Sequence, residues 1–82
     1  MGQSKSEIEI YPNPIKETFY INLGKTVSDT EIAITEMNGR VILKESYKNI
    51  QLIEISLPTP PGLYLLIINS EKRKVIFPVV RN

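Results

Sequence analysis

Apolar and polar residues alternate with a period of two along most of this chain, and turn residues interrupt the alternation at short intervals. Alternate side chains of a β-strand point to opposite faces of a sheet, so the pattern predicts strands. Seven short strands are expected, over residues 7–11, 18–23, 31–37, 40–47, 51–57, 63–69 and 74–80. Regular short strands separated by turn signals predict an all-β sandwich.

The chain is long enough for one domain only, because it has 82 residues. It contains no Cys and no His, which removes disulfides and the commonest metal ligand. The hydrophobic residues, 41% of the total, must therefore supply the core. Residues 7–82 are expected to form the domain, and residues 1–6 to be an added start or the remnant of an interdomain linker.

Composition argues against several classes of function. Ten basic and nine acidic residues leave a net charge of +1, which gives no electrostatic reason to expect nucleic acid or an anionic membrane as partner. No apolar run approaches the roughly 20 residues that span a bilayer. Without His a Ser nucleophile lacks its usual base, and the carboxylates show no paired spacing. We therefore expect no membrane span, no enzyme activity, no cofactor and no metal site.

Prolines and glycines fix the positions of several turns. Pro12 and Pro14 fix φ and lack backbone donors, so the first strand should stop at about Tyr11 and the chain should turn a corner there. Residues 24–29 are expected to form a polar loop. Pro78 lies in the last apolar strand, and because proline cannot donate to a ladder, it predicts an edge strand or a bulge.

Asn38-Gly39 is the strongest hairpin signal in the chain. A two-residue turn there pairs Met37 with Arg40. One face of the hairpin then carries four apolar side chains, Ile32, Ile34, Val41 and Leu43, with Ile34 opposite Leu43. A three-residue turn with a glycine bulge would pair Ile34 with Ile42 instead, and we favour the first register because it buries more apolar surface.

The last two expected strands are apolar on both faces, whereas a sandwich has only one core. One face is expected to fill the core with Leu63, Leu65, Ile67, Val75, Phe77 and Val79. The opposite face carries Tyr64, Leu66, Ile68, Ile76, Pro78 and Val80. That second face is either covered by loops or exposed, and an exposed face would dock a partner or form a homodimer through this C-terminal hairpin.

Four sequence elements occur in a distinctive order. They are Tyr11 to Pro14, then Asn38-Gly39-Arg40, then Leu57 with Gly62 and Tyr64, and finally an apolar strand flanked by Lys74 and Arg81. Over about residues 8–82, their order and spacing resemble the type A C-terminal sorting domain of the type IX secretion system (Por secretion system), found on Bacteroidetes cargo proteins. One departure is Pro78, which stands where that family usually has a Lys.

The resemblance implies a seven-stranded immunoglobulin-like β-sandwich at the C-terminus of a larger exported protein. The type IX outer-membrane machinery would recognise it in the periplasm, a sortase-like enzyme would cut at or before Ser6, and the cargo would reach the cell surface or the medium. The residues expected to contribute to recognition are Tyr11, Pro12, Asn13, Pro14, Gly39, Gly62, Tyr64, Leu66, Ile68, Lys74 and Arg81.

Structural roles compete with recognition at several of these positions. The segment from Tyr11 to Pro14 would also serve as a rigid corner. Gly62 would relieve a backbone constraint, and Tyr64 would bury its ring while its hydroxyl finds a partner. Basic residues 72–74 would also form a solvated turn that blunts an edge strand. For the whole domain, the alternative is a generic immunoglobulin- or fibronectin-like accessory or adhesion module; a sugar-binding sandwich has only a few aromatic residues in its favour.

Overall fold

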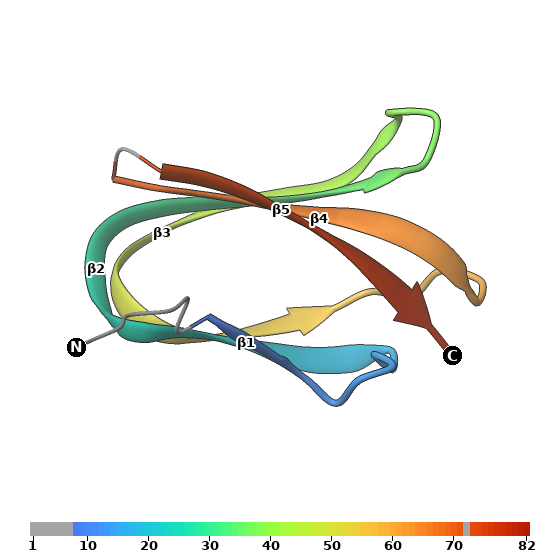
Figure 1. Cartoon of the computed structure of the whole chain (residues 1–82), viewed down its shortest axis with the longest axis horizontal. Coiled ribbons are helices and arrows are strands. Elements are labelled where there is room, and N and C mark those ends of the chain that lie inside the picture. The colour runs from blue at the N-terminus through green and yellow to red at the C-terminus, as the bar shows by residue number, and fades with distance from the viewer. Residues whose placement is uncertain (1–7, 72) are drawn as a thin grey trace, which may run out of the picture.

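The computed structural model describes residues 8–71 and 73–82. Five β-strands make up most of this part of the chain: β1 (Glu9–Tyr11), β2 (Thr18–Glu36), β3 (Val41–Ser56), β4 (Gly62–Ser70) and β5 (Arg73–Arg81) (Figure 1). The all-β prediction is confirmed, and the described residues form no helix. Residues 1–6, predicted to be an added start or a linker remnant, lie outside the described residues.

All five strands belong to one antiparallel sheet that curls into two facing layers (Figure 1). The long strands β2 and β3 bend and pass from one layer to the other. One layer holds β1, the first part of β2 and the last part of β3, and the other layer holds their remaining parts with β4 and β5. The prediction of seven strands is therefore wrong, because four of the seven expected segments belong to two continuous strands.

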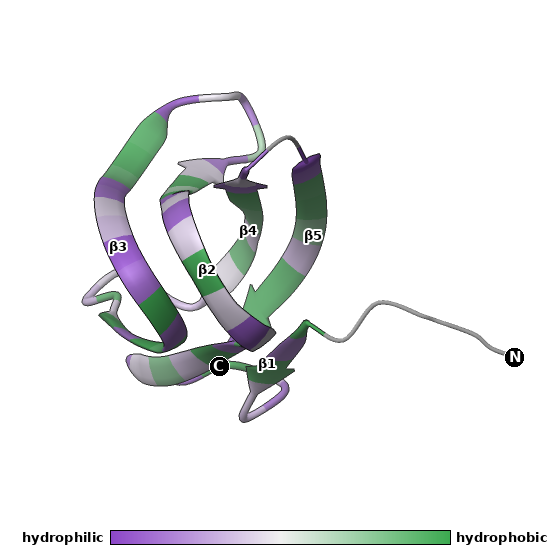
Figure 2. Ribbon diagram, turned by 90° about the vertical axis from the view of Figure 1, so that its left-hand side faces the viewer, coloured by the Kyte–Doolittle hydropathy of each residue, from purple (hydrophilic) through white to green (hydrophobic). Residues whose placement is uncertain are grey.

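The bend of β2 takes the place of the expected polar loop at residues 24–29. Asn22 pairs with Leu52 before the bend and Val27 pairs with Ile50 after it, so β2 bulges outward here. Gly24 has a φ of 84°, and its N–H donates to Asn22 Oδ1 at 2.8 Å. Figure 2 looks onto the bends and shows the polar middle of β3 between more apolar ends. Pairing with β3 resumes beyond the bulge, so these turn residues do not end the strand.

The β2–β3 hairpin turns over three residues, 37–39, and the predicted pair of Met37 with Arg40 is wrong. The Glu36 N–H donates to the Arg40 carbonyl at 2.9 Å, and the Gly39 N–H donates to the Glu36 carbonyl at 2.9 Å. Gly39 has a φ of 94°, which only glycine adopts readily. The positive φ that the Asn-Gly signal predicts therefore occurs, but in the longer turn.

The core lies between the two layers. The predicted pairing of Ile34 with Leu43 is confirmed, because a bulge at Ile42 compensates for the longer turn. Val41 is 56% exposed, so its predicted place on the core face is wrong. The core consists of 14 buried hydrophobic side chains: Ile15, Phe19, Ile21, Leu23, Val27, Ile32, Ile34, Ile53, Ile55, Leu57, Tyr64, Leu66, Ile68 and Val79.

The β4–β5 hairpin buries the face of β4 that we expected to lie opposite the core. The face that carries Leu63, which we expected to fill the core, is instead the outer one, since Leu63 is 47% exposed. Leu66 and Ile68 are fully buried, and they pair with Phe77 and Val75. Only residues 71 and 72 separate the two strands, and this short connection sets which face of β4 shares a side with Val75 and Phe77. Because both faces of β4 are apolar, the sequence pattern alone does not determine which face is buried. The docking role predicted for Leu66 and Ile68 is therefore wrong.

β5 is an edge strand, as Pro78 predicts. The Val80 carbonyl and the Asn82 N–H point away from β4, since both bond to Ile15. Backbone groups alternate in direction along an antiparallel strand, so Pro78 also faces the free edge. Its missing N–H therefore removes no hydrogen bond to β4.

Candidate recognition surface

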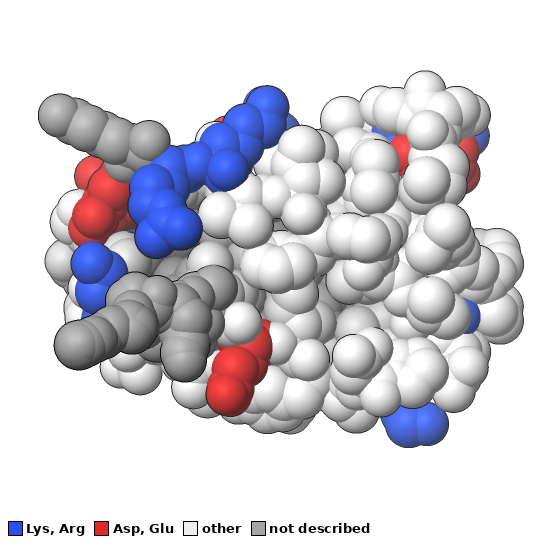
Figure 3. Space-filling model, viewed as in Figure 1, with Lys and Arg blue, Asp and Glu red and all other residues white. Residues whose placement is uncertain are grey.

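Most turns that the sequence marks with proline or glycine lie at one end of the molecule (Figure 1). We call it the motif end, and it consists of residues 11–17, 37–40, 57–64 and 81–82. The opposite end, the bend end, consists of residues 23–29, 46–50 and 69–75 without residue 72. Figure 3 shows one side of the molecule, on which charged side chains gather toward the bend end while the middle is largely uncharged.

Ile15 connects the proline corner to the end of β5. Its N–H donates to the Val80 carbonyl at 2.8 Å, and its carbonyl accepts the Asn82 N–H at 2.9 Å. The Ile15 side chain is fully buried. This short parallel bridge joins the two layers of the curled sheet at the motif end. Both peptide bonds that precede Pro12 and Pro14 are cis.

Arg81 connects the end of β5 to the segment after β3. Its Nε–H donates to the Leu57 carbonyl at 3.1 Å. The Leu57 N–H donates in turn to the Glu17 carbonyl at 2.6 Å, and the Leu57 side chain is fully buried. Arg81 thus stabilises the fold through this hydrogen bond, and its guanidinium lies at the motif end.

Tyr64 fixes the proline-rich segment that precedes β4. Its ring is buried, with 7% of the residue exposed, and its hydroxyl donates to the Pro60 carbonyl at 2.6 Å. The prediction that this tyrosine buries its ring and satisfies its hydroxyl is confirmed. Gly62 has no positive φ, and a Cβ added there would meet the Tyr64 side chain at 3.9 Å, an ordinary contact. The expected backbone constraint at Gly62 is therefore absent.

The structure brings eight of the eleven predicted recognition residues to the motif end: Tyr11, Pro12, Asn13, Pro14, Gly39, Gly62, Tyr64 and Arg81. Tyr11 is 40% exposed and stacks on Tyr20, with ring centroids 5.7 Å apart. Leu66 and Ile68 lie in the core, and exposed Lys74 lies at the bend end, paired across the hairpin with Asn69.

Sequence reasoning missed two residues of the motif end. Ile15 was not singled out, although a lone apolar residue directly after Pro14 is a signal for a buried anchor. Arg40 was noted in the Asn38-Gly39-Arg40 turn but was not predicted to be a recognition residue. The Arg40 side chain is exposed and makes no hydrogen bond or ion pair with the described residues. No contact within the fold therefore explains why an arginine occupies this position.

A continuous apolar surface covers the outside of the β4–β5 hairpin. We call it the outer apolar face, and it consists of the cross-strand pairs Leu63–Val80, Leu65–Pro78 and Ile67–Ile76. Leu63, Ile76 and Val80 are 47%, 52% and 48% exposed. A contiguous exposed apolar surface on a small domain marks an interaction site more often than scattered apolar residues do.

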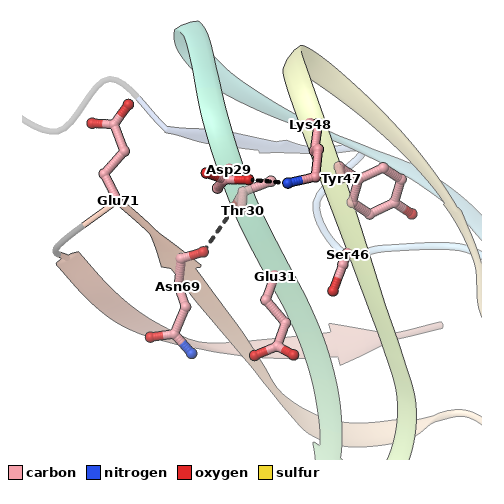
Figure 4. A pocket seen from close by; sticks show the side chains of 8 residues that line it. All are labelled: Asp29, Thr30, Glu31, Ser46, Tyr47, Lys48, Asn69 and Glu71. Carbon is pink, nitrogen blue, oxygen red and sulfur yellow. Dashed lines mark hydrogen bonds and ion pairs between the residues drawn. The ribbon is translucent and has the colours of Figure 1, made fainter.

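A polar hollow lies at the bend end, lined by Asp29, Thr30, Glu31, Ser46, Tyr47, Lys48, Asn69 and Glu71 (Figure 4). Lys48 Nζ donates to Asp29 Oδ1 at 2.8 Å, which raises the pKa of the Lys48 ammonium. Burial, followed by the nearby Glu45 carboxylate, raises the pKa of the Tyr47 hydroxyl. No cluster of His, Cys, Asp or Glu suited to a metal ion occurs within residues 8–71 and 73–82.

One known family matches most of the length of this chain. The sequence model of the family described as "Secretion system C-terminal sorting domain" matches residues 9–80, and no curated protein matches the chain. The part of the chain that the structure describes contains no helix long and apolar enough to cross a membrane. Members of this family are sorting signals, and the family is not a catalytic one. The match therefore does not favour the alternative of a generic accessory or adhesion module. The chain therefore belongs to the secretion system C-terminal sorting domains, and it is a sorting signal for export by type IX secretion.

Proposed function

We propose that the type IX machinery recognises this domain through its motif end. The observation that supports the proposal is that long-range hydrogen bonds tie separate motif elements together there, through Ile15, Arg81 and Leu57. Such a surface exists only in the folded domain, so the machinery would read a shape and not a linear peptide. Tyr11 to Pro14, Gly39, Gly62, Tyr64 and Arg81 would carry or support this surface.

The outer apolar face is the second part of the proposed recognition surface. It takes the docking role that the sequence assigned to the opposite face of β4. A homodimer through the same hairpin is the competing use of this surface, since a second copy would also cover exposed Leu63, Ile76 and Val80. Light scattering distinguishes the two uses: a monomer at assay concentration leaves the face free for the machinery.

The wider route belongs to the same proposal. The domain would pass through the periplasm, be bound at the outer membrane, and be removed by a sortase-like enzyme that cuts at or before Ser6. Export delivers the cargo to the cell surface or the medium. The two facing layers of the sheet also support an immunoglobulin-like sandwich, built from five strands.

An export assay tests this function. The chain is fused behind a signal peptide and a fluorescent reporter, in a bacterium with a working type IX system and in a strain that lacks it. We expect reporter at the surface or in the medium only in the first strain. Reporter retained in the periplasm of both strains, with the domain folded, would overturn the sorting role of this chain.

Matched variants locate the surface in the same assay. Leu63→Glu and Ile76→Glu place a charge on the outer apolar face, and we expect both to lower export. Leu52→Glu is the control, because Leu52 is 49% exposed, much like Leu63, but lies on β3 in the other layer. Equal export by all three variants would remove the outer apolar face from the proposal.

A further inference from the structure

A groove at the motif end lies between the β2–β3 hairpin and the proline-rich segment after β3. We call it the hairpin groove, and its lining residues include Glu36, Arg40, Val41, Thr59, Pro60 and Tyr64. Its volume is about 280 Å³. Two of the four sequence elements that mark the family meet here: the Asn38-Gly39-Arg40 turn and the element that runs from Leu57 to Tyr64.

Arg40 is held in place by its backbone while its side chain is unengaged. The Arg40 N–H donates to Asn38 Oδ1 at 3.0 Å, and its carbonyl accepts the Glu36 N–H at 2.9 Å. Its guanidinium has no hydrogen-bond or ion-pair partner among the described residues. At the same end, Arg81 uses its guanidinium to hold the Leu57 carbonyl. An unpaired guanidinium that extends from a fixed backbone position is suited to binding a carboxylate.

Thr59 also lines the groove, and it carries a polar group that the fold leaves unpaired. Its N–H donates to the Leu57 carbonyl at 2.8 Å, which fixes its backbone. Its hydroxyl oxygen is buried and has no hydrogen-bond partner in the part of the chain that the structure describes. A buried hydroxyl without a partner destabilises the fold, so the folded domain alone gives no reason for a threonine at this position.

We propose that the hairpin groove binds an extended acidic segment of the secretion machinery. This inference rests on the proposed function, because it names the chemistry of the partner at the motif end. Arg40 binds a carboxylate of that segment. The Thr59 hydroxyl, buried in the free domain, rotates about χ1 to bond to the main chain of the segment. Half-exposed Val41 and the ring of Pro60 provide apolar contact beside these groups.

Glu36 lines the same groove and sets the orientation of the bound segment. Glu36 and Arg40 are adjacent across the hairpin, yet no ion pair within 4.0 Å joins their side chains. The Glu36 carboxylate is an acceptor for a main-chain N–H of the segment, while its charge keeps the bound carboxylate on the Arg40 side.

The test measures export and thermal stability of the same variants, in the reporter assay described above. We expect Arg40→Gln to lower export about tenfold, as expected for the loss of a charge-assisted hydrogen bond, and Arg40→Glu to lower it further. Both variants should keep a Tm within about 2 °C of the unaltered chain. Arg73→Gln, an exposed arginine at the bend end, is the control and should export normally.

The variant Thr59→Val distinguishes a role in partner binding from a role in folding, because only a role in binding predicts lower export without a lower Tm. Removal of an unpaired buried hydroxyl should leave Tm unchanged or raise it, whereas loss of a contact to the partner should lower export. Normal export of Arg40→Gln and Thr59→Val would overturn this inference and leave the sorting function intact. A fall in Tm that parallels the fall in export would also overturn it, in favour of a structural role. Failure of the unaltered chain to export in a system-dependent way would overturn the sorting function itself.

Discussion

The two ends of this domain are built on different principles. At the motif end, residues far apart in sequence are joined by hydrogen bonds: Ile15 to Val80 and Asn82, and Arg81 to Leu57. At the bend end, β2 and β3 simply continue from one layer to the other, and the side-chain ion pair there, Lys48 with Asp29, is exposed. The sheet is closed by covalent continuity at one end and by motif residues at the other.

This difference explains why the sequence elements of the family cluster at one end. A curled sheet needs no hydrogen bonds between distant segments where its strands bend continuously, but its open end must be closed by contacts between loops and chain termini. Ile15, directly after Pro14, provides such a contact to the end of β5, and Tyr64 holds the proline-rich segment before β4 through the Pro60 carbonyl. Recognition and closure therefore use the same end, and a change there affects both.

The largest expected effect comes from breaking the closure of the motif end. Ile15→Ala should lower the free energy of unfolding by about 2–5 kcal/mol, because Ile15 is fully buried and its loss leaves a cavity. Ile76→Ala makes the same chemical change at a residue that is 52% exposed, and it should cost less than about 0.5 kcal/mol. Urea denaturation measures both.

Ile15→Val keeps the comparison measurable if Ile15→Ala does not fold. It should cost about 0.5–1.5 kcal/mol. Equal denaturation midpoints for the Ile15 and Ile76 variants would contradict the closing role of Ile15.

A smaller effect is expected from the two glycines of the motif end. Gly39→Ala should destabilise the domain by about 1–2 kcal/mol, because alanine is strained at a φ of 94°. Gly62→Ala should be neutral or slightly stabilising, because an added Cβ meets only the Tyr64 side chain at 3.9 Å. Thermal denaturation of both variants tests this, and a larger loss for Gly62→Ala would show that Gly62 is under a constraint the backbone does not reveal.

Several elements could be predicted because a single residue determines them. Pro12 and Pro14 end β1 at Tyr11, Pro78 places β5 at an edge, and Gly39 marks the positive φ of the hairpin. In each case the local backbone chemistry leaves one outcome, so neither the partner strands nor the packing had to be known.

Other elements could not be predicted because they depend on packing between distant segments. Leu66 and Leu65 are both leucines in an apolar run, and only the short connection to β5 and the pairing with Ile34 decide that Leu66 is buried. The bend of β2 looked like a loop because Gly24 and its polar neighbours are turn residues, yet β3 continues to pair beyond them. The contact of Arg81 with Leu57 spans 24 positions and leaves no local pattern.

Charges at the two ends should contribute unequally to stability. Arg81→Met removes a partly buried hydrogen bond to the Leu57 carbonyl and should cost about 1 kcal/mol. It should also speed hydrogen exchange of the Asn82 amide, which bonds to Ile15 beside it. Lys48→Met removes an exposed ion pair and should have a smaller effect than Arg81→Met. A larger loss for Lys48→Met would reverse the comparison between the ends.

The smallest effect is a loss of stability at alkaline pH that originates at the bend end. The pKa of Lys48 is raised above 10.5 by its hydrogen bond to Asp29, and the pKa of Tyr47 is raised above 10.0 by burial and then by Glu45. The folded state therefore keeps these two protons over a pH range in which the unfolded chain has released them. Their contribution to the free energy of unfolding is complete below about pH 10, and it is lost as the pH rises through the pKa values of the folded state. We expect Tm to fall as the pH rises above about 10, and to fall less in the double variant Tyr47→Phe, Lys48→Arg, because neither replacement releases a proton where Tyr and Lys do. An identical fall in the double variant would assign the alkaline transition to groups outside the bend end.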